Sequence, residues 1–172
     1  IEPDSYIAHR FAGLCCIGLR SYSDAVVHFE AATASLESDF TAASFVVQCH
    51  EANGDALKAR DAARRALTRI EKVVAAQPDH GRAIGFGVGM LASLGETERA
   101  KEWVVRGRLL DPGNASLLYN FACAMVQLHD DEIVGRFHSN SQLKLRYDRH
   151  TAPRFFGKVT TAARSFNLES HA

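Results

Sequence analysis

The chain has 172 residues and balances 20 Lys and Arg against 20 Asp and Glu, so its formal net charge at pH 7 is zero. A balanced charge gives no general attraction to nucleic acid or to an acidic membrane surface. No apolar run approaches the length of a membrane-spanning helix, and no charged and apolar leader precedes the first predicted helix. Abundant Ala and Leu with only 4 prolines favour helix over sheet.

Residues 6–39 are predicted to form a pair of helices. The stretch "FAGLCCIGL" supplies a wide apolar stripe, "RSYSD" a polar turn, and "SYSDAVVHFEAA" the second helix. Asp39 is a candidate N-cap for the helix that follows. We therefore expect one antiparallel helix pair here, joined by a short turn.

Residues 40–80 are predicted to form a second pair with a longer second helix. Ala25 and Ala32 recur as Ala59 and Ala66 at one constant spacing of about 34 residues, which indicates an internal repeat. The next matching interval, from Gly54 to Gly95, is longer than this spacing by seven positions. Seven positions are two helical turns, so we expect the second helix of this unit to overhang its neighbours by about 10 Å.

Residues 81–114 form the third predicted unit, which opens with the glycine-rich stretch "GRAIGFGVGM". A phosphate-binding loop is disfavoured because the stretch follows a proline stop at Pro78 rather than a strand. Gly81, Gly85 and Gly89 instead recur every four residues and share one helix face. Two alternatives remain: the glycines keep a groove open for a ligand, or they allow close packing of a neighbouring helix or of the chain's own tail.

Residues 115–137 form a fourth unit with a clear first helix, "LLYNFACAMVQL", and a less regular second one. Asp79 and Asn114 are candidate N-caps for the third and fourth units, and Pro78 and Pro112 are expected to end the second helices before them. Residues 138–172 form a tail with six Lys or Arg against two Asp or Glu. We expect this basic tail to contribute a capping helix, and docking of the tail on the acidic repeat body is the alternative.

Small and aromatic residues in phase, such as Gly13, Ala25, Phe29 and Ala32, resemble the tetratricopeptide repeat (TPR) over residues 4–137. The resemblance implies an all-α, right-handed superhelix of antiparallel helix pairs with about four repeats. It further implies a protein-protein interaction module whose concave groove binds a peptide or partner protein. The carboxylate-binding set of some family members is not carried over, because Leu14 and Phe45 stand where that set has Asn.

A narrower resemblance adds an alternative function. The stretches "AARRAL", "LGETERAKEW", "LDPGN" and "LLYNFAC" are similar to the repeat region C-terminal to the catalytic domain of bacterial class III nucleotide cyclases. This resemblance implies a regulatory or dimerising segment of a bacterial signalling enzyme, and a homodimer is accordingly one of the expected assemblies. Catalysis would then lie outside these residues.

In repeat phase, the candidate partner-binding residues lie on the groove side of the first helices. Arg10 and Arg82 among them are suited to an acidic peptide, with solvated arginines as the alternative. The full predicted set is Arg10, Leu14, Ser44, Gln48, Glu51, Arg82, Gly85, Gly89, Tyr119, Asn120, Cys123 and Gln127.

No pattern of residues points to an enzyme, a cofactor or a metal. The eight His residues show no ligand spacing, and the four cysteines form no C-x-x-C pair. Cysteines in apolar helical stretches predict buried thiols in a reducing compartment, which suggests the cytoplasm. Basic residues along residues 58–72 predict a solvated outer face rather than a nucleic-acid site, because no aromatics alternate with them.

Overall fold

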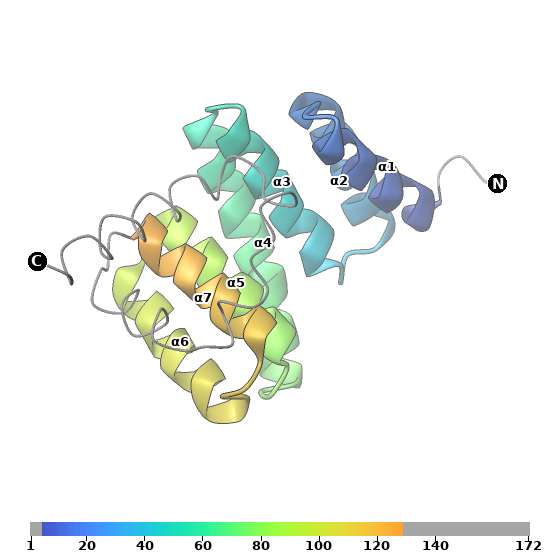
Figure 1. Cartoon of the computed structure of the whole chain (residues 1–172). Helices are drawn as coiled ribbons and strands as arrows, with labels where there is room; N and C mark the ends of the chain where they lie inside the picture. Colours follow the sequence, from blue (N-terminus) through green and yellow to red (C-terminus); the bar gives the residue numbers. More distant parts are fainter. Residues whose placement is uncertain (1–4, 129–172) are drawn as a thin grey trace, which may run out of the picture.

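The computed structural model describes residues 5–128, and within this range the chain forms helices and no strand (Figure 1). The architecture is an all-α helical-repeat superhelix of antiparallel pairs, as the sequence predicts. The second helix of the fourth unit and the expected capping helix in 138–172 lie outside the described residues, so the domain boundary at 137 stays a prediction. The helices are α1 (Tyr6–Gly18), α2 (Tyr22–Ser35), α3 (Phe40–Ala52), α4 (Ala56–Ala76), α5 (Gly81–Leu94), α6 (Thr97–Leu110) and α7 (Ala115–Gln127).

Local chemistry fixes the helix ends. The Asp39 carboxylate accepts hydrogen bonds from the backbone N–H groups of Thr41 and Ala42 and so caps α3, and the Asn114 side chain caps α7 in the same way. The prediction of Asp79 as the cap of α5 is wrong by one residue. His80 holds that position, and its ring nitrogen accepts from the backbone N–H of Ala83.

The second helix of the second unit is longer than its counterparts, as predicted. Helix α4 has 21 residues, whereas α2 and α6 have 14 each. The added turns do not project freely, because Ile70 is fully buried and Val74 is 6% exposed. The overhang expected from the sequence is therefore packed along one side.

Small residues let the helices approach closely, and aromatic residues fill the space between them. Phe29 of α2 is fully buried and lies against Gly13 of α1, where a Cβ atom would come within 2.8 Å of its ring. Phe121 of α7 is also fully buried and lies over Gly107 of α6. Each aromatic ring thus occupies space that a glycine on the neighbouring helix leaves free.

Helix α7 departs from the regular stacking. Helix α3 packs on α2 and α5 packs on α4, each on the second helix of the preceding unit. By contrast, α7 lies mainly along α5 and touches α6 only slightly, and Figure 1 shows α7 and α5 side by side. The last described helix therefore covers part of the surface that α5 would otherwise present.

Candidate first-helix binding face

The candidate site is the surface formed by α1, α3, α5 and α7, which we call the first-helix face. Gly85 in this face is buried, and a Cβ atom there would lie 3.0 Å from Cδ1 of Leu117 and 3.2 Å from Nδ2 of Asn120. Helix packing is therefore the alternative that applies at Gly85. A Cβ at Gly81 or Gly89 would meet nothing within 4 Å, so these two positions leave open space.

Ser44 is a second correction to the predicted set. It is fully buried, and its hydroxyl donates a hydrogen bond to the carbonyl of Phe40 one turn earlier, at 2.8 Å. Because this hydroxyl is both buried and bonded within its own helix, a partner cannot reach it. Ser44 is thus a packing residue. Gln48, one turn further along α3, is exposed on the surface.

A polar cluster lies where α1 meets the start of α3. Tyr6 donates a hydrogen bond from its hydroxyl to Oδ2 of Asp39 at 2.7 Å, while Oδ1 of Asp39 caps α3. Nε of Arg10 lies 4.0 Å from the same Oδ2, is buried, and has no hydrogen-bond partner among the described residues. A buried donor without a partner costs free energy. Because 30% of the Arg10 side chain is exposed, a ligand could reach the remainder of its guanidinium.

Arg82 brings a second positive charge toward this cluster. Burial raises the pKa of Tyr6, and its hydrogen bond to Asp39 adds to this effect, whereas the charges of Arg10 and Arg82 oppose it. The guanidinium of Arg82 also lies 5.8 Å from the ring centre of Phe86. The positive charges of both guanidinium groups therefore act on the Tyr6 hydroxyl.

A polar link ties three first helices together at the other end of the face. Oε1 of Glu51 in α3 accepts hydrogen bonds from Oγ of Ser93 in α5 at 2.7 Å and from Nε2 of Gln127 in α7 at 3.2 Å. The predicted residues Glu51 and Gln127 meet here although they are 76 positions apart. Ser93 was not predicted, and a serine at one turn from Gly89 gives no sequence signal for this role.

The remaining predicted residues are partly buried. Leu14 packs against the apolar core, and Asn120 faces Gly85. Burial raises the pKa of the Cys123 thiol to about 11, and a hydrogen bond with Tyr119 acts in the opposite direction. Cys123 is therefore a neutral thiol at physiological pH and provides no nucleophile.

The prediction of buried cysteines holds only in part. Cys49 is 1% exposed, and burial raises the pKa of its thiol to about 12. Cys16 is half-buried, whereas Cys15 is exposed on α1. All four cysteines are free thiols.

The basic residues of α4 are paired with neighbouring elements. Arg69 donates to the backbone carbonyls of Thr33 and Glu37 at the end of α2, and Lys72 forms an ion pair with Glu37 at 3.3 Å. Arg65 lies 3.9 Å from the carboxylate of Glu30. These contacts join α4 to α2, which favours a structural role for the basic stripe over a phosphate-binding one.

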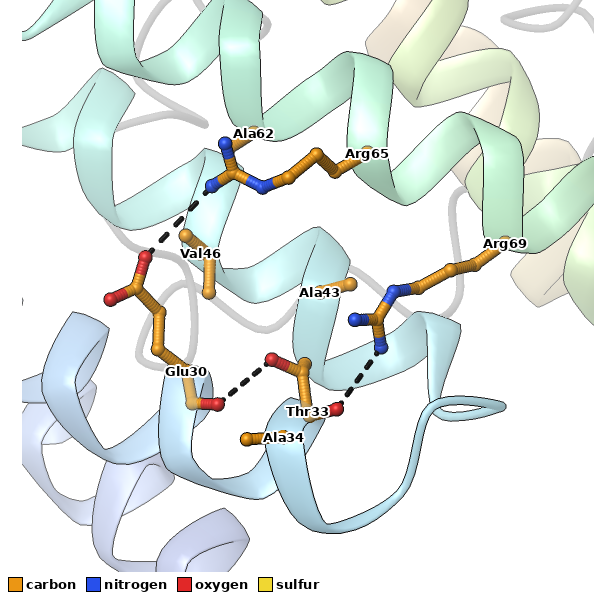
Figure 2. A pocket seen from close by; sticks show the side chains of 8 residues that line it. All are labelled: Glu30, Thr33, Ala34, Ala43, Val46, Ala62, Arg65 and Arg69. Atoms are coloured by element: carbon orange, nitrogen blue, oxygen red, sulfur yellow. Dashed lines mark hydrogen bonds and ion pairs between the residues drawn. The ribbon is translucent and has the colours of Figure 1, made fainter.

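A pocket of about 300 Å³ lies where α2, α3 and α4 meet, and Figure 2 shows it from close by. Small apolar side chains line one part of it and polar side chains the other. The Arg65 and Arg69 side chains already engage Glu30 and the Thr33 carbonyl across the pocket (Figure 2). The lining residues are Glu30, Thr33, Ala34, Ala43, Val46, Ala62, Arg65 and Arg69.

Two structural findings for residues 5–128 concern metal binding and membranes. No group of three or more His, Cys, Asp or Glu side chains in this range is placed to hold a metal ion. None of the helices in this range is both long enough and apolar enough to span a membrane.

Comparison with known proteins supports the fold. No protein-family model and no curated protein matches the sequence. Among solved structures, the crystal structure of MamA protein matches with a TM-score of 0.51 and 17% identity, over 88% of this chain and 81% of that chain. The crystal structure of YrrB, titled a TPR protein with an unusual peptide-binding site, has a TM-score of 0.42 and 13% identity, over 96% and 94%. At such identities, the likeness to MamA shows a shared helical-repeat fold, and the cyclase-like resemblance stays a prediction.

Proposed function

We propose that the chain is a protein-protein interaction module that binds an acidic segment of a partner along the first-helix face. The observation that carries the proposal is the Arg10 guanidinium, whose side chain is 30% exposed and whose Nε has no hydrogen-bond partner among the described residues. Neither the Arg10 nor the Arg82 guanidinium donates a hydrogen bond among the described residues, so both retain donors for an added carboxylate. A cytoplasmic location accompanies this proposal as an expectation only.

The surroundings of the two arginines suit a peptide rather than a free ion. The Arg82 guanidinium lies over Phe86, and Phe86 makes edge contacts with Phe40 and Phe45, at ring-centre distances of 5.8 and 6.4 Å. Phe86 and Phe45 are both half-buried. An acidic residue next to an apolar one would meet charge and aromatic surface together.

The test is selection from short random peptides, followed by titration of a labelled selected peptide against the full chain. We expect selected peptides to be enriched in Asp and Glu, and binding to weaken at higher salt. Arg10→Gln and Arg82→Gln should each weaken binding about tenfold or more, since a hydrogen bond to a charged group contributes about 1.5–3 kcal/mol.

Arg64→Gln is the matched control, because Arg64 is exposed on α4 and pairs locally with Asp61. This variant should bind like the unaltered chain. Peptides without acidic residues, or equal binding by all three variants, would overturn the proposed function.

A further inference from the structure

The outer surface of α1 is an apolar helix face that remains open among the described residues. Ile7, Phe11 and Cys15 recur every four residues and so share one side of the helix. Ile7 is 61% exposed, Phe11 is 58% exposed, and Cys15 is exposed. We call these three residues the α1 outer face.

The repeat shows what this face does elsewhere in the molecule. Phe45 holds in α3 the repeat position that Phe11 holds in α1, and it stacks on Phe29 of α2 with ring centres 5.1 Å apart. Cys49 likewise matches Cys15 in the repeat, and it is 1% exposed. In α3 these positions receive the second helix of the preceding unit, so the α1 outer face has the chemistry of a helix-docking surface.

The charge pattern of α1 indicates which kind of helix can dock on the α1 outer face. Arg10 is the one Lys, Arg, Asp or Glu residue between Tyr6 and Gly18, and its Nε is directed at Asp39 on another side of α1. A two-fold interface must be complementary to itself, and an uncharged apolar stripe meets this requirement without like-charge repulsion. We propose that two copies of the chain pair through their α1 outer faces, with the two α1 helices antiparallel.

The antiparallel arrangement determines which residues meet across the interface. Ile7 and Cys15 each lie four residues from Phe11, about 6 Å along the axis. With Phe11 opposite Phe11 at the two-fold axis, Ile7 of each copy faces Cys15 of the other. The helix dipoles then oppose each other, which favours this arrangement over a parallel one.

The face is small, which sets the strength of the pairing. Helix α1 has 13 residues and is about 20 Å long. One helix pair of this length buries less than a standard interface of about 800 Å² per partner. We therefore expect a dissociation constant of about 10–100 µM.

Sedimentation equilibrium of the full chain tests the proposal. The apparent mass should rise with concentration from 18.8 kDa towards twice that value. Phe11→Glu places two carboxylates against each other at the two-fold axis and should weaken pairing at least about tenfold. Circular dichroism should show an unchanged helical fold, because Phe11 is largely exposed.

Leu57→Glu serves as the control, since Leu57 on α4 is 82% exposed and lies outside the α1 outer face. This variant should dimerise like the unaltered chain. A monomer at about 100 µM would overturn the proposal in favour of another occupant of the face. A dimer that survives Phe11→Glu would overturn it in favour of another interface.

Oxidative cross-linking tests the direction of the helices. Ile7→Cys should give a disulfide between position 7 of one copy and Cys15 of the other, identified by peptide mapping. The unaltered chain should not cross-link rapidly through Cys15, because its two Cys15 residues would lie about 12 Å apart along the axis. Rapid linking of Cys15 to Cys15 would overturn the antiparallel arrangement. Peptide binding by the Arg10 cluster is unaffected by Phe11→Glu in this scheme, so the two proposals fail separately.

Discussion

Three glycines within one short stretch of α5 have different surroundings in the structure. A Cβ atom at Gly87 would overlap Cζ3 of Trp103 and lie 2.7 Å from its Cε3. At Gly85 it would press on α7, and at Gly89 it would meet open space. With Gly81, which also meets open space, the glycine-rich stretch combines two helix contacts and two open positions.

Gly87→Ala is expected to destabilise the fold by about 1–3 kcal/mol, because the added methyl displaces a large, half-buried indole. The same change at Gly89 should be neutral or should stabilise by up to about 1 kcal/mol, since Ala favours the helix and nothing opposes the methyl. Urea unfolding of both variants measures the difference. Equal stability of the two variants would contradict the packing described for Gly87.

The cysteines are expected to differ in reactivity because they differ in burial. Burial raises the pKa of Cys49 to about 12, so its reactive thiolate is scarce at pH 8, and the thiol is also covered. In dilute protein, a thiol reagent should modify the exposed Cys15 first and Cys49 only after unfolding. Timed mass spectrometry follows both sites, and Cys15→Ser should remove the fast phase. Rapid modification of Cys49 in folded protein would contradict its burial.

The raised pKa of Cys49 also affects the stability of the fold at alkaline pH. The ordinary pKa of a cysteine thiol is 9.0, and burial in the folded chain raises the pKa of Cys49 above this value. The stability gained by keeping this thiol neutral is therefore fully present below pH 9 and is lost as the pH rises towards 12. Between pH 9 and pH 12, the melting temperature should fall more steeply with pH for the unaltered chain than for Cys49→Ala. An equal fall of the melting temperature in both proteins would exclude Cys49 as a cause of the lost alkaline stability.

At the scale of helices, the sequence predicts well what depends on local chemistry and period. Helices α1, α3, α5 and α7 begin at Tyr6, Phe40, Gly81 and Ala115, where caps and apolar periodicity change together. The two inserted turns likewise appear as added length in α4. Such features depend on residues a few positions apart, which a single sequence displays.

Contacts between distant helices were harder to predict. Helix α7 meets α5 through Leu117 at Gly85 and meets α6 through Phe121 at Gly107, and no repeat spacing reports these contacts. The Glu51–Ser93 hydrogen bond joins residues 42 positions apart. Ser44 tolerates burial because its hydroxyl bonds to the Phe40 carbonyl in the same helix, and the sequence does not show that its side of α3 is covered. The candidate site was therefore predicted as a face, but not as individual contacts.

The extension of α4 is expected to contribute to stability rather than to serve as a free arm. Ile70 is fully buried, and its Cγ2 would lie 3.2 Å from a Cβ at Gly87. Ile70→Ala should cost about 2–5 kcal/mol, the usual range for a large buried aliphatic side chain. Lys72→Ala, an exposed neighbour paired with Glu37, should change stability by less than about 1 kcal/mol. Chemical denaturation compares the two, and a small effect at Ile70 would mean that the extension is loosely held.

On the scale of the whole molecule, stability is shared between neighbours along the stack. Each helix pair contacts the next, and few contacts skip a unit. The middle helices are held from both sides, whereas α1 is held mainly by α2 and by the Tyr6–Asp39 hydrogen bond. The proposed peptide contact and the proposed dimer contact both involve α1, which among the helices of residues 5–128 has the fewest neighbours.

This arrangement predicts a gradient of local stability. In dilute protein, backbone amides of α1 should exchange with deuterium faster than those of α3, α4 and α5, because fewer packed contacts must break to expose them. Helix α7 should be protected where it covers Gly85, since Leu117 is buried against α5 and Phe121 is buried against Gly107 of α6. Hydrogen exchange followed by mass spectrometry gives the order directly.

Raising the protein concentration should slow exchange in α1 selectively in the unaltered chain but not in Phe11→Glu, because pairing adds to α1 the contacts that α3 already has. Uniform exchange through α1–α5 at low concentration would contradict the gradient and would place the stability of the first unit on a par with the centre of the stack.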